Sequence, residues 1–224
     1  MHLVLYCSVM NITANREPLF KNRKLAGKAL GLFLTSQFKS QNPIVAGLQG
    51  GGAEVAWYVA KELEAPLIIV VSMELPMPAN QEYGFGAITE DHSVYIPGEA
   101  GIILDEIAIN QVIERLKPEV DRLIITYRQG RPLPDLQGRL VILIDEGIVT
   151  GMTLVPVIRL CRKKGASKVV VATPVSGEVY DKAVEEADDI KVMVKSDHFL
   201  AKGQAYEQSA KTDIQQPAKP EMKG

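Results

Sequence analysis

Short apolar segments of strand length alternate along this chain with longer segments that have the periodicity of amphipathic helices. Residues 66–73 (PLIIVVSM) are apolar without alternation, as expected for a strand that is covered on both faces. Residues 20–38 instead repeat apolar side chains near helical spacing, with lysines on the other side. The pattern predicts an α/β fold, Rossmann-like, with a mostly parallel sheet flanked by helices. The expected strands are 43–48, 66–73, 139–145, 168–175 and 190–195, and the expected helices are 20–38, 53–65, 152–164 and 177–187.

The middle of the chain departs from this alternation. Residues 85–96 (FGAITEDHSVYI) place two short apolar runs around Glu-Asp-His, which predicts a hairpin. A helix is expected over 104–116. Pro118 is expected to begin a second helix, 118–128, because proline fits the first helical position. We therefore expect a hairpin and helical insertion, followed by a loop at 129–138.

Composition excludes several classes of function. The 224 residues carry a net charge of −2, so no basic field favours a nucleic acid or an anionic membrane as partner. No apolar run approaches the roughly 20 residues that a membrane-spanning helix needs. Cys7 and Cys161 match no metal or redox spacing and are interpreted as reduced core thiols. We expect a cytoplasmic protein with small-molecule partners.

The stretch VILIDEGIVTGMT, residues 141–153, carries the most specific chemistry. An apolar strand runs into Asp145 and Glu146, and a loop rich in Gly and Thr then leads into a helix. Such a loop exposes unpaired backbone N–H groups at a helix N-terminus, where a phosphate binds well. The two acids would repel that phosphate, so they must face another part of the ligand, either a pair of hydroxyls or a metal ion. A phosphorylated ribose satisfies both demands.

This stretch resembles the signature of the type I phosphoribosyltransferases, which use 5-phosphoribosyl 1-pyrophosphate (PRPP). Further segments resemble a bacterial and archaeal group of that family whose substrate is undefined. These segments are FKNRKLAGKAL, GLQGGG, PANQEYGFGAI, YRQGRPLPDLQGR and GQAYE. The resemblance implies a single domain over residues 19–207, with an N-terminal extension (1–18) and a C-terminal tail (208–224). It also implies a homodimer and a small hood over the site, which we would assemble from residues 19–24 and 196–207.

The resemblance assigns roles to two loops and implies transfer of the phosphoribosyl group to a small nitrogenous, nucleobase-like acceptor with release of pyrophosphate. Asp145 and Glu146 would hold the ribose hydroxyls. Mg²⁺ would arrive with PRPP, with Asp145 as a candidate ligand. The 5′-phosphate would lie in the loop Gly147, Ile148, Val149, Thr150, Gly151, Met152 and Thr153, and the pyrophosphate would meet Leu48, Gln49, Gly50, Gly51 and Gly52.

Several cations expected at the pyrophosphate are replaced in this chain. The similar group usually has an arginine where Gly50 stands, and a basic pair where Met73 and Glu74 stand. Arg128 and Arg131 are candidates to compensate. Arg23 is interpreted either as a residue that reaches the site from the first helix or, preferably, as a solvated helix charge. The alternative function is therefore a non-catalytic protein of the same fold that binds PRPP, a nucleotide or ribose 5-phosphate in a regulatory role.

Overall fold

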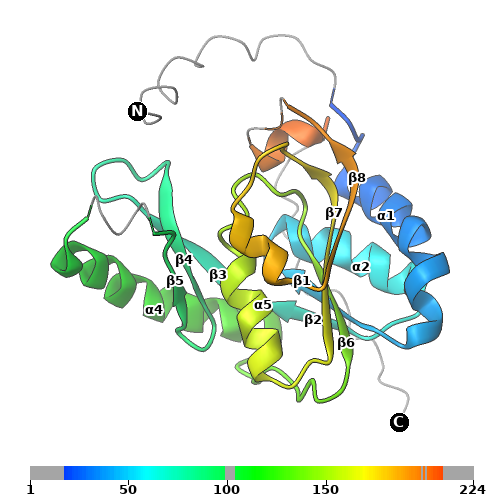
Figure 1. The fold of residues 1–224 in the computed structure, drawn as a ribbon, viewed down its shortest axis with the longest axis horizontal. Coiled ribbons are helices and arrows are strands. Elements are labelled where there is room, and N and C mark those ends of the chain that lie inside the picture. The colour runs from blue at the N-terminus through cyan, green and yellow to red at the C-terminus, as the bar shows by residue number, and fades with distance from the viewer. Residues whose placement is uncertain (1–17, 99–103, 198, 200, 209–224) are drawn as a thin grey trace.

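A parallel sheet of five strands forms the centre of the protein (Figure 1). The computed structural model describes residues 18–98, 104–197, 199 and 201–208. The strand order is β2-β1-β6-β7-β8, and every neighbouring pair is parallel. The strands are β1 (Ile44–Leu48), β2 (Leu67–Val70), β6 (Leu140–Ile144), β7 (Lys168–Ser176) and β8 (Asp189–Lys195). The predicted α/β fold with a mostly parallel sheet is confirmed.

Helices cover both faces of this sheet. Helices α1 (Arg23–Phe38) and α2 (Gly51–Leu63) lie on one face, and α5 (Leu154–Lys163) lies on the other (Figure 1). Alternate residues of β6 divide between the two cores. Val141 and Leu143 pack with the apolar residues of α5, while Ile142 and Ile144 pack with those of α1 and α2. Because every β6 residue is buried, the strand reads as an unbroken apolar run.

A second, antiparallel sheet stands beside the first. It contains β3 (Ser72–Pro76), β4 (Gly84–Thr89) and β5 (Val94–Tyr95), in the order β3-β4-β5. The predicted hairpin at 85–96 is thus confirmed as β4 and β5. The single strand predicted over 66–73 is wrong, because the chain leaves the parallel sheet at Val71. Side chains replace the ladder there: Glu90 accepts from the Val71 amide, and Gln49 bonds both backbone groups of Ser72.

The insertion is completed by one long helix, α4 (Glu106–Arg128), with Pro118 inside it. The prediction of two helices that divide at Pro118 is therefore wrong. Val112, Leu116 and Val120 follow one another at helical spacing across the proline and are buried in the core of the second sheet. Burial of this continuous apolar face outweighs the hydrogen bond that Pro118 cannot donate.

Replacing Pro118 with alanine is expected to stabilise the protein. The exposed proline costs about 3 kcal/mol relative to alanine inside a helix, and its restriction of the unfolded chain returns about 0.4–1 kcal/mol. Urea denaturation should therefore show a free energy of unfolding about 2 kcal/mol higher for Pro118→Ala. The same change at the exposed loop residue Pro134 should give no such gain. A lower urea midpoint for Pro118→Ala would contradict this explanation.

The helix predicted over 177–187 is also wrong. Only a short 3-10 helix, η3 (Lys182–Glu186), forms there. The backbone just before η3 is hydrogen-bonded to the loop that follows β6. The Gly177 amide donates to the Ile148 carbonyl, and the Asp181 amide donates to the Thr150 carbonyl. These bonds replace the helical ladder and support the loop that follows β6.

The two ends of the described chain meet over the carboxyl side of the parallel sheet. Phe20 forms a parallel bridge with Tyr206, and the Phe20 amide donates to the Ala205 carbonyl at 2.9 Å. Phe20, Tyr206 and Phe199 pack in one apolar cluster, which also contacts Val149. The two segments expected to form a hood therefore lie together, against the loop after β6.

Cys161 is a fully buried free thiol on α5, as predicted. Burial raises the pKa of this thiol to about 12, which keeps it protonated and unreactive near neutral pH. Cys7 lies outside the described residues.

Candidate active site

The two loops singled out in the sequence leave the sheet side by side. Strands β1 and β6 are parallel neighbours, with Gly47 opposite Ile144 at their carboxyl ends. The segment Gln49–Gly50 therefore begins next to the segment that starts at Asp145. Ligands of open α/β sheets bind at such carboxyl ends.

The loop after β6 keeps several of its amides available. The Ile148 amide donates to Val175 and the Leu154 amide to Gly151, which anchors both ends of the loop. Four other amides of this loop have no hydrogen-bond acceptor among the described residues, namely those of Val149, Thr150, Gly151 and Thr153. Gly151 has φ +77°, a conformation that favours glycine and turns the backbone sharply. The loop thus presents a group of donors just before α5.

Both acids lie against the first turn of α2. The Asp145 side chain is only 3% exposed, and its Oδ1 accepts from the Glu146 amide at 2.8 Å. A Cβ added to Gly51 would lie 1.9 Å from Glu146 Oε2, and one added to Gly52 would lie 3.2 Å from Asp145 Oδ1. The glycines of this loop therefore make room for the two carboxylates. The positive end of the α2 dipole favours negative charge at this place.

Arg23 joins this group, contrary to the interpretation of a solvated charge. Its Nε donates to Glu146 Oε2 at 2.5 Å, and the two side chains are 11% and 13% exposed. The guanidinium also lies over the Tyr206 ring, 5.0 Å from the centroid. Sequence reasoning missed this contact because 123 positions separate the partners.

Tyr206 ties the hood to the acid pair. Its hydroxyl donates to the Glu146 carbonyl at 2.6 Å. Burial, followed by the nearby Glu146 carboxylate, raises the pKa of Tyr206 above its ordinary value, so the hydroxyl remains a donor. The ring is 3% exposed and belongs to the apolar cluster of the hood. Tyr206 is thus a packing residue with a polar function at its tip.

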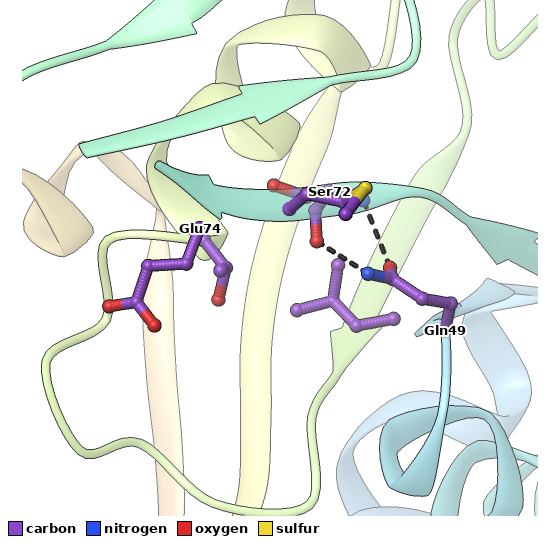
Figure 2. Close-up of a pocket in the computed structure, with 6 residues that line it drawn as sticks. Gln49, Ser72 and Glu74 are labelled. Carbon is purple, nitrogen blue, oxygen red and sulfur yellow. Dashed lines mark hydrogen bonds between the residues drawn. The ribbon is translucent and has the colours of Figure 1, made fainter. Parts of the chain in front are cut away.

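A cavity of about 260 Å³ lies between the two loops and β3. Figure 2 shows Gln49 reaching across to Ser72, while the Glu74 carboxylate points away from Gln49. Gln49 donates to the Ser72 carbonyl at 2.5 Å and accepts from its amide at 2.9 Å, which fixes the loop against β3. The cavity is lined by Leu48, Gln49, Ser72, Met73, Glu74 and Thr153.

Gly50 has a conformation that disfavours an arginine. Its φ is +80°, in the region that L side chains rarely adopt. Its amide donates to the hydroxyl of Tyr127 at 3.0 Å, so α4 reaches the pyrophosphate loop through Tyr127. Tyr127 is the first residue of the segment YRQGRPLPDLQGR, and no pattern in the sequence marks it as a site residue.

The two arginines expected to compensate at the pyrophosphate have other partners. Arg128 donates to the Glu90 carboxylate from both terminal nitrogens, at 2.7 and 2.6 Å, and to the Ile69 carbonyl. This pair is 10% and 7% exposed, so it belongs to the junction of the two sheets. Arg131 is exposed, and its guanidinium donates to Gln129. Arg128 is therefore held at the junction of the two sheets by this ion pair, and its expected contact with pyrophosphate stays a prediction.

Breaking the Arg128–Glu90 pair is expected to destabilise the fold strongly. Glu90→Gln would leave a buried guanidinium without its counter-charge, which costs about 3–5 kcal/mol. Chemical denaturation measures this loss. As a matched control, Glu119→Gln removes the partner of exposed Arg122 and should cost about 0–1 kcal/mol. A loss for Glu90→Gln no larger than for this control would contradict the structural role.

The aromatic and histidine side chains outside the acid pair have ordinary positions. Phe85 and Phe199 are buried core residues, and Tyr83 is exposed. His92 occupies the β4–β5 turn at φ +60° and pairs with Asp121. Within the described part of the chain, no group of three or more potential metal-ligating side chains gathers, and no helix is both long and apolar enough to cross a bilayer.

Comparison with known proteins identifies the class. The phosphoribosyl transferase domain family matches residues 8–209, and the chain belongs to this family. Its fold, a mostly parallel sheet flanked by helices, is the one expected from the resemblance to this family.

Two curated relatives carry names from this family, and one solved structure is similar in fold. Two curated proteins of Mycobacterium tuberculosis, from strains CDC 1551 and H37Rv, carry provisional names as phosphoribosyl transferases. Each is 34% identical over 197 residues, which is 87% of this chain and 44% of the relative. The chain therefore spans less than half the length of these relatives. The crystal structure of TT1426 from Thermus thermophilus has a TM-score of 0.66 at 28% identity, covering 84% of this chain and 89% of that one.

Proposed function

We propose that this protein transfers the 5-phosphoribosyl group of PRPP to a small nitrogenous, nucleobase-like acceptor, with release of pyrophosphate. The observation that carries the proposal is the juxtaposition at the end of β6. Amides without an acceptor among the described residues lie directly after two carboxylates that are held in place, beside a cavity. A ribose 5-phosphate unit needs donors for its phosphate and acceptors for its hydroxyls in this arrangement.

Hydrogen-bond donors and carboxylates of the site would bind different parts of the ligand. The amides and the Thr150 and Thr153 hydroxyls would hold the 5′-phosphate at the positive end of α5. Asp145 and Glu146 would accept hydrogen bonds from the ribose hydroxyls, which fixes the sugar ring. Transfer requires cleavage of the bond between the anomeric carbon and pyrophosphate, and attack by the acceptor nitrogen on the opposite face. The protein contributes by positioning the reactants and stabilising charge.

Mg²⁺ would neutralise charge on the departing pyrophosphate. The donor set suits this ion, because carboxylate oxygens are hard ligands and Mg²⁺ commonly uses one or two of them together with substrate phosphates. The described residues supply Asp145 at the end of β6 but no dedicated cage of ligands. We therefore propose that Mg²⁺ binds together with PRPP.

The direct test is release of pyrophosphate from Mg·PRPP in the presence of a panel of purine, pyrimidine and simple amine acceptors. We expect acceptor-dependent release with at least one member, and loss of that release in Asp145→Asn. A full-chain protein that binds PRPP but releases no pyrophosphate with any acceptor would contradict transferase activity.

A second candidate is a non-catalytic binder of PRPP, a nucleotide or ribose 5-phosphate. It is favoured by the cavity lining, in which the described residues include acidic Glu74 and no cationic side chain. A unit-charge interaction near 4 Å is worth roughly 4 kcal/mol at an effective dielectric of 20, so this lining disfavours pyrophosphate. Calorimetry distinguishes the candidates: tighter binding of Mg·PRPP than of AMP or ribose 5-phosphate supports the transferase, and equal binding supports the binder.

We further propose a cytoplasmic homodimer. Leu25, Leu32 and Phe33 are exposed on one side of α1, and a second copy of the chain would cover this apolar surface. The mass in solution from light scattering tests the dimer, and Leu32→Lys should shift it toward the monomer. The protonated, buried Cys161 thiol agrees with a reducing compartment.

A further inference from the structure

Arg23 occupies an unfavourable place for a cation. It is the first residue of α1, where the helix dipole has its positive end, and the first turn of this helix contains no acid. Asn22 caps the helix by accepting from the Leu25 amide, so the arginine is not needed for the cap. A buried cation at this position must be held by a partner elsewhere in the fold.

Glu146 and Tyr206 are those partners. The Arg23 Nε donates to Glu146, and the guanidinium plane is supported by the Tyr206 ring. Tyr206 is in turn held by its bond to the Glu146 carbonyl. The guanidinium is therefore fixed in direction before any ligand arrives, which reduces the entropy lost when it binds an anion.

The fixed guanidinium lies against the pyrophosphate loop. A Cβ added to Gly51 would be 2.5 Å from Arg23 Nε, so cation and loop are in direct contact. Of the guanidinium nitrogens of Arg23, only Nε donates to Glu146. Among the described residues, the two terminal nitrogens of Arg23 have no hydrogen-bond acceptor, which leaves four N–H donors. Gly50, the neighbouring residue, has no side chain that could supply a charge.

We propose that Arg23 binds the pyrophosphate group of the ligand and so supplies, from α1, a positive charge that residue 50 does not. Glu146 holds the guanidinium ready and neutralises it until the ligand enters. Its pairing with Arg23 also lowers the repulsion between the acid pair and an incoming anion. This inference rests on the proposed function, since it places the pyrophosphate at residues 49–51.

Calorimetry of Arg23→Gln with three ligands tests the assignment: Mg·PRPP, Mg·pyrophosphate and ribose 5-phosphate. We expect affinity for the two pyrophosphate-containing ligands to fall by about tenfold or more, as for loss of a charge-assisted hydrogen bond. Affinity for ribose 5-phosphate should change by less than about threefold. Arg23→Lys, which keeps the charge, should recover part of the loss. Lys24→Gln removes an exposed charge from the same helix turn and should have no such selective effect.

The outcomes separate this inference from the proposed function. If Arg23→Gln weakens all three ligands equally, Arg23 only positions Glu146 and the inference is overturned, while the phosphoribosyl site stands. The inference is also overturned if no affinity changes. If the natural protein binds Mg·pyrophosphate in an Arg23-dependent way but not ribose 5-phosphate, the anion site stands and the proposed function fails. Thermal melting shows that each variant is folded, and absence of binding to every ligand overturns both.

Discussion

Asp145→Asn is expected to remove most of the affinity for ribose 5-phosphate and PRPP while leaving the fold intact. The asparagine keeps the shape and the acceptor oxygen that bonds the Glu146 amide. It loses the negative charge that strengthens hydrogen bonds from ribose hydroxyls. A hydrogen bond to a charged group is worth about 1.5–3 kcal/mol, so affinity should fall roughly 10- to 150-fold.

Calorimetry and thermal melting of the same samples check this result. Asp135→Asn is a matched control, because the Asp135 carboxylate also accepts from a backbone amide, that of Gln137, in an exposed loop away from the acid pair. The control should bind normally. Unchanged affinity in Asp145→Asn, with a normal melting temperature, would remove this carboxylate from the binding site.

Gly51→Ala is expected to damage the site without unfolding the protein. The new Cβ would lie 1.9 Å from Glu146 Oε2, so the carboxylate and its partner Arg23 must move. Both groups are ends of flexible side chains, and alanine has a higher helix propensity than glycine at this first residue of α2. Stability should therefore be kept or slightly raised, whereas affinity for ribose 5-phosphate should fall about tenfold through loss of one charge-assisted contact.

Denaturation of Gly51→Ala should show retained stability, whereas titration with ribose 5-phosphate should show reduced affinity. Gly98→Ala serves as the control, because an added Cβ there meets nothing within 4 Å. If Gly51→Ala keeps full affinity, the glycines do not make room for a functional carboxylate. If it loses stability and affinity together, the loop is structural instead.

Sequence patterns predicted the parallel sheet because its strands are buried on both faces and read as unbroken apolar runs. They failed where a tertiary contact decided the local structure. Pro118 would end an isolated helix, but the apolar face from Val112 to Val120 is buried as one surface. The run 66–73 divides because Gln49 and Glu90 take over the backbone bonds near Val71, and nothing in the run itself signals this.

The candidate site, too, could be predicted from the sequence only in part. The acids and the loop after β6 lie in one contiguous segment, so their chemistry could be interpreted from the sequence. Arg23 and Tyr127 come from helices that only the folded chain brings to the loops, across 123 and 77 positions. One signal could have drawn attention to Arg23, namely a cation at the start of a helix whose first turn contains no acid.

We propose that the amides after β6 bind a phosphate while the acids bind its sugar. ¹⁵N–¹H correlation spectroscopy of the full chain during titration with ribose 5-phosphate tests this assignment at the amides themselves. We predict saturable shifts of the Val149, Thr150, Gly151 and Thr153 amides. The Ile148 and Leu154 amides, which already have acceptors, should shift less. Saturation that leaves the first four amides in place, or that shifts only amides far from this loop, would contradict the assignment.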